Sequence, residues 1–404
     1  MVDHIKNYLE RISIGLLSII VFLFPIHQKI ISPFIVLWIV FTVTYLILIK
    51  PKFTFSKSFL GLLVFYFFLI IGLLWTDNLD SGIFDLEVKL SLAIFPLFML
   101  FLQYELKSIK WIIYAFFLGL LIGSFILLFG ATERFLMYPS YTYYFYIQLS
   151  DHIHPTYMSL YYAVAIGIIL ADLSRVKTLF FKNKVLAVLI VSYFSVYNFL
   201  LLSKVGIIAT LLIILVFLVR WSIINQRILY LASVMLLIGI VSYTSYEKSS
   251  YFKQRMNELV SGLIVSDKNP NNGSTGIRLQ IWGESTHLIK EKPIFGYGTG
   301  DVKDVLVNQY NKVGMIKASE TSLNAHNQFF QIAISLGLTG LLLFIFILYE
   351  AVKTGIKNHN VFIVNFVLLF CLFFITESML ETQAGTIFFG LFFSLLSQKA
   401  LTEK

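Results

Sequence analysis

The first candidate for chemistry is an arginine and a tryptophan in the segment 276–282, which reads GIRLQIW. If this segment is helical, Arg278 and Trp282 share one face at a spacing of four residues. A guanidinium is always charged and can bind two phosphate oxygens at once. The segment therefore predicts either an anion-binding arginine or a surface arginine beside a packing tryptophan.

A glycine-rich segment follows at 291–301, with the sequence EKPIFGYGTGD. Gly298 and Gly300 permit close backbone approach and could form a nest of amides for an anion. The spacing matches neither a phosphate-binding loop nor a dinucleotide fingerprint. A tight turn is the simpler interpretation.

The segment 324–328 reads NAHNQ and precedes a long apolar run. His326 lies at this boundary, and a histidine side chain could take or give a proton there. An ordinary interfacial histidine is the alternative, and Asn327 is its polar neighbour. We take His326 as a candidate general base.

Three ionisable residues lie in or beside apolar runs, where a charge is costly and usually has a partner or a function. Lys204 follows Ser203 in a short turn between two apolar runs, and it could also extend to the headgroups. Glu377 and Glu381 form an acidic pair at a spacing of four residues. This pair is a possible partner for Lys204 or Arg278.

Other polar patterns are weak. The segment 151–154 reads DHIH, but two histidines and one carboxylate with this spacing make a poor metal site, so no metal is predicted. The tyrosines between 141 and 146 fit an interfacial belt better than a sugar platform. The one cysteine, Cys371, excludes an intrachain disulfide.

The elements that position these residues must lie in lipid. The 404 residues are 58% hydrophobic and only 13% charged, and the mean hydropathy is +0.82. Soluble domains are about 25% charged, so this surface cannot mostly face water. The net charge of +9 is explained by basic cytoplasmic loops, and no nucleic acid is predicted as a partner.

Apolar runs predict an all-α integral membrane protein with about twelve transmembrane helices, because a helix needs ~20 residues to cross the bilayer. The long polar segment 245–327, between the ninth and tenth spans, divides the chain into 1–244, 245–327 and 328–404. The first run is not followed by a cleavage site and is expected to be retained. The predicted spans are 12–27, 30–49, 58–75, 86–103, 109–130, 156–172, 184–202, 205–220, 227–244, 328–349, 361–379 and 384–398.

Basic residues alternate between the short loops. One set, which includes both termini, carries most of the lysines and arginines, whereas the other set holds only Lys29, Arg134 and Lys204. Positive loops stay inside, so both termini are predicted to be cytoplasmic and 245–327 to lie outside.

Taken in order, the motifs resemble those of the O-antigen ligase and polymerase superfamily of bacterial membrane glycosyltransferases. The resemblance rests on Arg278 with Trp282, on PIFGYGTG at 293–300, on AHNQ at 325–328 and on GLTG at 337–340. HPTY at 154–157 is similar to a segment of ligase-like members. ESMLE at 377–381 also looks like the family.

The resemblance implies an enzyme of the bacterial inner membrane whose large loop is periplasmic. Such enzymes move a glycan from undecaprenyl diphosphate to a lipid A-core sugar, to another carrier-linked chain or to a protein. A ligase is favoured over a polymerase by the HPTY segment. The family implies no cofactor and no metal.

The family's loop arginine matches Arg278, and its histidine matches His326. Lys204 stands where the family has an arginine, so it keeps the charge without the bidentate fork. We expect Arg278 and Lys204 to bind the diphosphate and His326 to activate the acceptor hydroxyl, with inversion at the anomeric carbon. Trp282, Glu377, Glu381, Asn327, Gly298 and Gly300 are the expected supporting residues. A membrane transporter is the competing class, although no internal repeat is visible.

Overall fold

The computed structural model describes residues 2–150, 152–227 and 273–402, together with isolated positions between 229 and 257. All the elements described there are α-helices or short 3-10 helices. The α-helices are α1 (Val2–Leu23), α2 (Ile31–Ile49), α3 (Lys57–Ile71), α4 (Leu79–Lys89), α5 (Ser91–Met99), α6 (Leu106–Met137), α7 (Tyr146–Leu149), α8 (Pro155–Leu173), α9 (Lys184–Leu200), α10 (Lys204–Ile224), α13 (Gly273–Glu291), α14 (Val302–Lys312), α15 (Ile316–Glu320), α16 (Gln328–Lys357), α17 (Val361–Thr376) and α18 (Gln383–Leu396). The 3-10 helices are η1 (Gln28–Ile30), η2 (Gly72–Trp75), η3 (Tyr141–Tyr144), η4 (Met379–Glu381) and η5 (Lys399–Leu401).

Within these ranges, six helical stretches are long and apolar enough to cross a bilayer, and shorter apolar helices accompany them. This confirms a helical membrane protein. The six stretches are Gln28–Ile49, Lys57–Trp75, Leu106–Met137, Pro155–Leu173, Lys204–Ile224 and Gln328–Lys357. The shorter ones, α9, α17 and α18, fall on the predicted spans 184–202, 361–379 and 384–398.

Two predicted spans differ from the structure. The span 86–103 is wrong as one helix, because the α-helix is interrupted at Leu90. The Leu90 amide bonds to the carbonyl of Glu87, three residues back, and not to the residue four back. The remaining α5 has nine residues and is only about 13 Å long. The span 12–27 is replaced by α1, which begins at Val2 and ends before Pro25. The span 227–244 lies largely outside the described residues.

The interior is built around α8, which is buried along nearly its whole length between α17, α9 and α10. Helices α16, α17 and α18 form the adjoining layer, and α1 packs on α2 and α6. Phenylalanines fill the space between these helices, as in the contact of Phe116 with Phe392, whose ring centroids lie 4.8 Å apart. A buried aromatic interior of this kind fixes the helices that carry the polar site.

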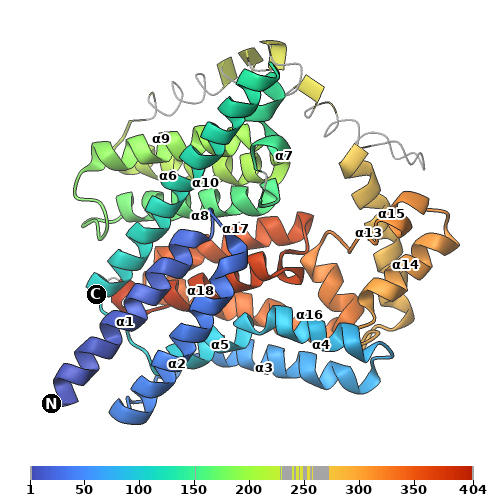
Figure 1. Ribbon diagram of the computed structural model, residues 1–404, viewed down its shortest axis with the longest axis horizontal. Helices are drawn as coiled ribbons and strands as arrows, with labels where there is room; N and C mark the ends of the chain where they lie inside the picture. The colour runs from blue at the N-terminus through green and yellow to red at the C-terminus, as the bar shows by residue number, and fades with distance from the viewer. Residues whose placement is uncertain are drawn as a thin grey trace.

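Helices α13, α14 and α15 have their own apolar cluster, which includes Ile281, Leu306 and Tyr310. They account for the second part of the predicted loop 245–327, and the first part lies largely outside the described residues. Figure 1 shows this unit at the right of the molecule and both ends of the chain at the left. The unit joins the rest of the molecule mainly through α16.

Candidate active site

Glu377 brings together the two side chains that the sequence singled out for catalysis. Its Oε2 accepts a hydrogen bond from the Arg278 guanidinium at 2.9 Å, and its Oε1 lies 2.8 Å from Nδ1 of His326. Arg278 comes from α13, His326 from the turn before α16, and Glu377 from the residue after α17. The Glu377 side chain is 9% exposed, whereas those of Arg278 and His326 are 25% and 19% exposed. The carboxylate at the centre of the site is therefore buried, whereas Arg278 and His326 are partly exposed and accessible to a substrate.

The sequence placed Glu377 inside a helical span, in register with Glu381. In the structure α17 ends at Thr376, and Glu377 has an extended backbone with φ −153° and ψ 144°. The two carboxylates therefore do not form a pair on one helix face. Because Glu377 is extended, its side chain does not point along the face that a continued α17 would give it. It points instead toward Arg278 and His326.

His326 lies in a left-handed turn with φ +45°. A non-glycine residue in this region costs on the order of 1 kcal/mol and persists only where neighbouring contacts hold it. Its amide donates to the Asn324 side chain at 2.9 Å. The preceding Ala325 donates its amide to Gln331 and accepts a hydrogen bond from the Trp282 indole at 3.1 Å. The strained backbone thus fixes where the imidazole points.

Asn327 begins α16 immediately after this turn. Its side-chain oxygen accepts hydrogen bonds from the amides of Phe329 and Phe330, which caps the helix. Its own amide donates to the Ser378 hydroxyl at 3.2 Å, next to Glu377. Asn327 is therefore a structural support of the site. Trp282 has the same role, because its indole holds Ala325, the residue before His326.

The electrostatics of Glu377 decide the tautomer of His326. Burial raises the pKa of the Glu377 carboxyl, but the hydrogen bond and charge of His326, with the charges of Arg278 and His154, outweigh it and lower the pKa below its usual value. An ionised Glu377 can only accept, so Nδ1 of His326 must carry the proton. Nε2 of a neutral imidazole then holds the lone pair, as in a base oriented by a carboxylate.

Lys204 is the first residue of α10, and its ammonium donates to the Thr275 hydroxyl at 3.0 Å. Thr275 lies on α13, three residues before Arg278, so both cations approach the same end of this helix. Of the two cations suggested as partners of the acidic pair, Arg278 is the one that the described contacts join to it, through Glu377. Glu381 instead binds Lys89 at 2.8 Å and Gln328 at 3.2 Å.

The glycine-rich segment packs against a kink in α16, where Gly337 has φ +66°. The amides of Tyr297 and Gly298 donate to the carbonyls of Ile334 and Ser335 at 2.9 Å each, and the Gly300 amide donates to Thr76. A Cβ added at Gly300 would lie 2.2 Å from the Asn78 oxygen. These glycines therefore allow close backbone approach, and the amides suggested for an anion nest are engaged inside the protein.

Sequence reasoning missed several residues at this site. His154, discounted as part of a weak metal fragment, caps α8 and lies close enough to Glu377 to influence its ionisation. Tyr157 is buried at the start of α8 and lies near the carboxylates of Glu377 and Glu381. Lys89 and Gln328 contact Glu381. The HPTY pattern was the only signal that pointed to His154 and Tyr157, and Lys89 had none beyond its charge in an apolar run.

Comparison with known proteins shows what part of the chain is similar to. Residues 160–345 match the model of a family described as O-antigen ligase. A Rickettsia felis protein named provisionally as a polysaccharide ligase is 35% identical over 91 residues, or 22% of each chain, and a Rickettsia conorii protein with a similar name is 33% identical over the same share. An uncharacterised Haemophilus influenzae protein is 26% identical over 177 residues, which are 41% of this chain and 44% of that one. The matches thus cover less than half of the relatives' lengths, and they confirm the resemblance to the O-antigen ligase superfamily.

Proposed function

Because residues 160–345 carry an O-antigen ligase family domain, we propose that this protein transfers a glycan from undecaprenyl diphosphate to a lipid A-core sugar or a similar acceptor. The observation that carries the proposal is the contact of Arg278 and His326 with the two oxygens of Glu377. One cation for a diphosphate and one oriented base are the groups that such a transfer requires.

Arg278 is the diphosphate-binding residue. Its ion pair with Glu377 involves one nitrogen of the guanidinium, which has five N–H donors in all. The remaining donors suit the oxygens of a phosphate, where negative charge grows as the leaving group departs. Lys204 of α10 reaches the first turn of α13 through its hydrogen bond to Thr275, and it supplies a second positive charge to this end of the site.

His326 is the general base. Nε2 takes the proton of the acceptor hydroxyl while its oxygen bonds to the anomeric carbon of the glycan. The bond from that carbon to the diphosphate oxygen breaks, and undecaprenyl diphosphate leaves with the electron pair. Attack from the face opposite the leaving group inverts the anomeric centre. The proton on Nε2 is then released to solvent or to the diphosphate, and no cofactor or metal takes part in these steps.

The setting of this reaction is the periplasmic face of the bacterial inner membrane. We propose about twelve spans, both termini in the cytoplasm and the segment 245–327 outside. The position of both chain ends opposite α13–α15 supports termini on one side and the site on the other (Figure 1).

A ligase is favoured over a polymerase by one observation. His154 and Tyr157, from the segment that resembles ligase-like members, both lie near Glu377. A ligase would join polymer to the lipid core, whereas a polymerase would extend the polymer on its carrier.

Deletion of the gene in its host, followed by gel analysis of surface glycolipids, tests this function. Loss of long-chain glycan from the lipid core, with polymer retained on the carrier, supports a ligase. Cores that carry a single repeat indicate the polymerase, and an unchanged ladder contradicts both. Wild-type protein should restore the ladder and His326→Ala should not.

Purified protein with carrier-linked glycan extracted from the host tests the chemistry. Transfer that continues in the presence of a chelator agrees with metal independence. Transport of the intact lipid-linked glycan without a new glycosidic bond would favour the transporter instead.

A further inference from the structure

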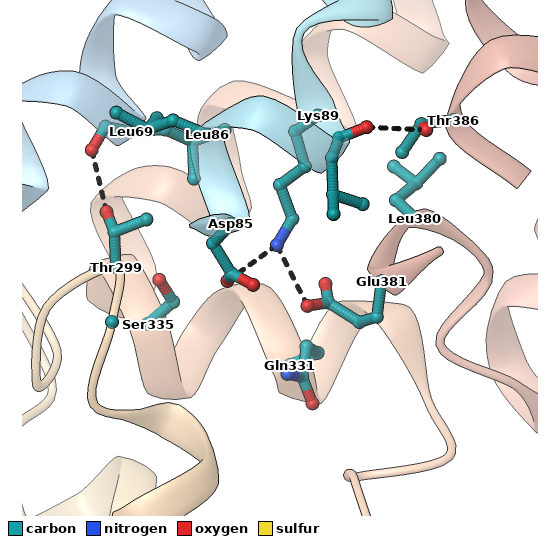
Figure 2. A network of polar contacts seen from close by, with 12 residues as sticks. Leu69, Asp85, Leu86, Lys89, Thr299, Gln331, Ser335, Leu380, Glu381 and Thr386 are labelled. Atoms are coloured by element: carbon teal, nitrogen blue, oxygen red, sulfur yellow. Dashed lines mark hydrogen bonds and ion pairs between the residues drawn. The ribbon is translucent and has the colours of Figure 1, made fainter. Parts of the chain in front are cut away.

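Lys89, at the end of α4, is a buried lysine held by two carboxylates. Its ammonium lies 2.8 Å from Oδ2 of Asp85 on the same helix and 2.8 Å from Oε2 of Glu381 in η4, and its side chain is 7% exposed. Figure 2 shows the ammonium between the two acids. Burying an ammonium costs several kcal/mol unless it is paired, so this arrangement needs a reason.

Glu381 connects this lysine to α16. Its Oε1 accepts a hydrogen bond from the Gln328 amide at 3.2 Å, and the Gln328 oxygen accepts the amide of Leu380 at 2.6 Å. Gln328 is buried and is the first residue of α16. Lys89, Glu381 and Gln328 thus tie the turn before α16 to the turn after α17.

These two turns carry the site. His326 lies two residues before Gln328, and Glu377 lies four residues before Glu381. Because His326 has a left-handed backbone, its turn needs contacts of this kind to stay in place. The end of α4 is itself held, since the Thr386 hydroxyl of α18 donates to the carbonyl of Val88 at 2.8 Å.

Lys89 also balances charge beside the base. Glu377 and Glu381 both contact the start of α16, Glu377 through His326 at 2.8 Å and Glu381 through Gln328 at 3.2 Å, so the two carboxylates share one neighbourhood. Glu377 has Arg278 as its cationic partner, and Glu381 has Lys89. Among the described residues, the ionisable groups around the site are Asp85 and Lys89 of α4, His154 and Tyr157 of α8, Lys204 of α10, Arg278 of α13, Glu377, Glu381 and His326.

We propose that Lys89 is a positioning residue for the transfer, which acts through Glu381 and Gln328 on the turn of His326 and offsets the charge of Glu381 near the base. This inference rests on the proposed function. It differs from a general folding role because it predicts a change in the ionisation of His326 as well as in the rate.

The test compares three variants of the purified protein with carrier-linked glycan extracted from the host. Lys89→Met keeps the bulk and removes the charge. Glu381→Gln keeps a hydrogen-bonding group for Gln328 and leaves Lys89 paired with Asp85. Asp85→Asn is the matched control, because it removes a carboxylate that binds Lys89 and has no hydrogen bond to Gln328.

Lys89→Met should lower kcat at least about tenfold with little change in KM, since a displacement near the reacting groups affects the chemical step. The acid limb of the rate profile should move up by about half a pH unit, because an unpaired Glu381 charge stabilises protonated His326. Adding Glu381→Gln to Lys89→Met should return the acid limb of the rate profile to its wild-type pH. Glu381→Gln alone should move the acid limb to lower pH. Asp85→Asn should keep kcat within about threefold of the wild-type value.

A wild-type rate with an unshifted profile in Lys89→Met overturns the proposal. If Lys89→Met does not fold, an unshifted limb in Glu381→Gln overturns it. Equal losses in Lys89→Met and Asp85→Asn with no shift of the limb assign the cluster to folding alone and also contradict the proposal. A wild-type protein that makes no glycosidic bond overturns the proposed function and this inference together, which distinguishes the two failures.

Discussion

Nδ1 of His326 lies 2.8 Å from Oε1 of Glu377, although the two residues are 51 positions apart in the chain. The contact forms because α17 ends one residue before Glu377, while the turn at His326 is forced into the left-handed region. Each departure from regular structure places one member of the pair. The carboxylate then accepts from two side chains, the His326 imidazole on one oxygen and the Arg278 guanidinium on the other.

Replacement of His326 by asparagine should abolish transfer without unfolding the turn. Asparagine tolerates the left-handed backbone better than most residues but cannot act as a base near neutral pH. We expect the transfer rate to fall about a hundredfold to ten-thousandfold, with a melting temperature near that of the wild type. His326→Ala is the matched control, which should lose the rate and also some stability. Transfer by His326→Asn at the wild-type rate would exclude the histidine as the base.

Arg278→Ala should remove both diphosphate binding and the partner of Glu377. The rate should fall about a hundredfold to a thousandfold, as for loss of an electrostatic donor. Arg278→Lys keeps the charge without the fork and should give an intermediate rate. Initial rates in membranes that contain equal amounts of each variant provide the measurement. Near-normal transfer by Arg278→Ala would remove the arginine from the mechanism.

Lys204→Met should weaken binding of the lipid-linked donor more than it slows the chemical step. We expect KM to rise about tenfold, the effect of a charge-assisted hydrogen bond, and Lys204→Arg to preserve binding. Thr275→Val removes the hydroxyl that accepts from Lys204 at 3.0 Å but keeps the charge, so it should have a smaller effect. A kcat loss with unchanged KM in Lys204→Met would contradict a role in donor binding.

Stability should decrease in acid because of Glu377. The pKa of this carboxyl is lower in the folded protein than the usual value of about 4.3, so its ion pairs contribute fully above that value. The contribution is lost as the pH falls through the folded pKa. Melting temperatures measured from pH 7 downward should therefore drop below about pH 4.5, and Glu377→Gln should show a lower plateau and a shallower drop. A variant whose melting curve follows the wild type at every pH would contradict this linkage.

Gly337→Ala should destabilise the protein and loosen the glycine-rich segment. The residue has φ +66°, and an added Cβ would lie 2.2 Å from the Ile294 oxygen, so strain and collision act together. We expect a loss of at least about 2 kcal/mol in the free energy of unfolding. Gly130→Ala is the matched control, because nothing lies within 4 Å of its added Cβ and the residue is in a helix. A smaller loss for Gly337→Ala than for the control would contradict the packing role of this kink.

The amino-acid sequence was enough to assign the protein to the helical membrane proteins and to single out Arg278 and His326 as candidate reactive residues. Hydropathy alone requires helices in lipid, because backbone amides have no other partner there. The order of Arg278, the glycine-rich segment and His326 sufficed to suggest the family, since these motifs are local strings. Glu377 could be named as a partner for Arg278, because a charge in an apolar run needs compensation.

Which of these side chains contact one another follows from the folded arrangement and not from any local pattern. The break at Leu90 and the end of α17 at Thr376 depend on packing between distant helices, which hydropathy averages away. The pairing of Glu381 with Lys89 joins residues that are 292 positions apart, and no local pattern favoured it over Lys204. The roles of Gly298 and Gly300 likewise follow from which backbone approaches them. Contacts between segments far apart in the chain are set by the whole packed interior, and they therefore had to be seen in three dimensions.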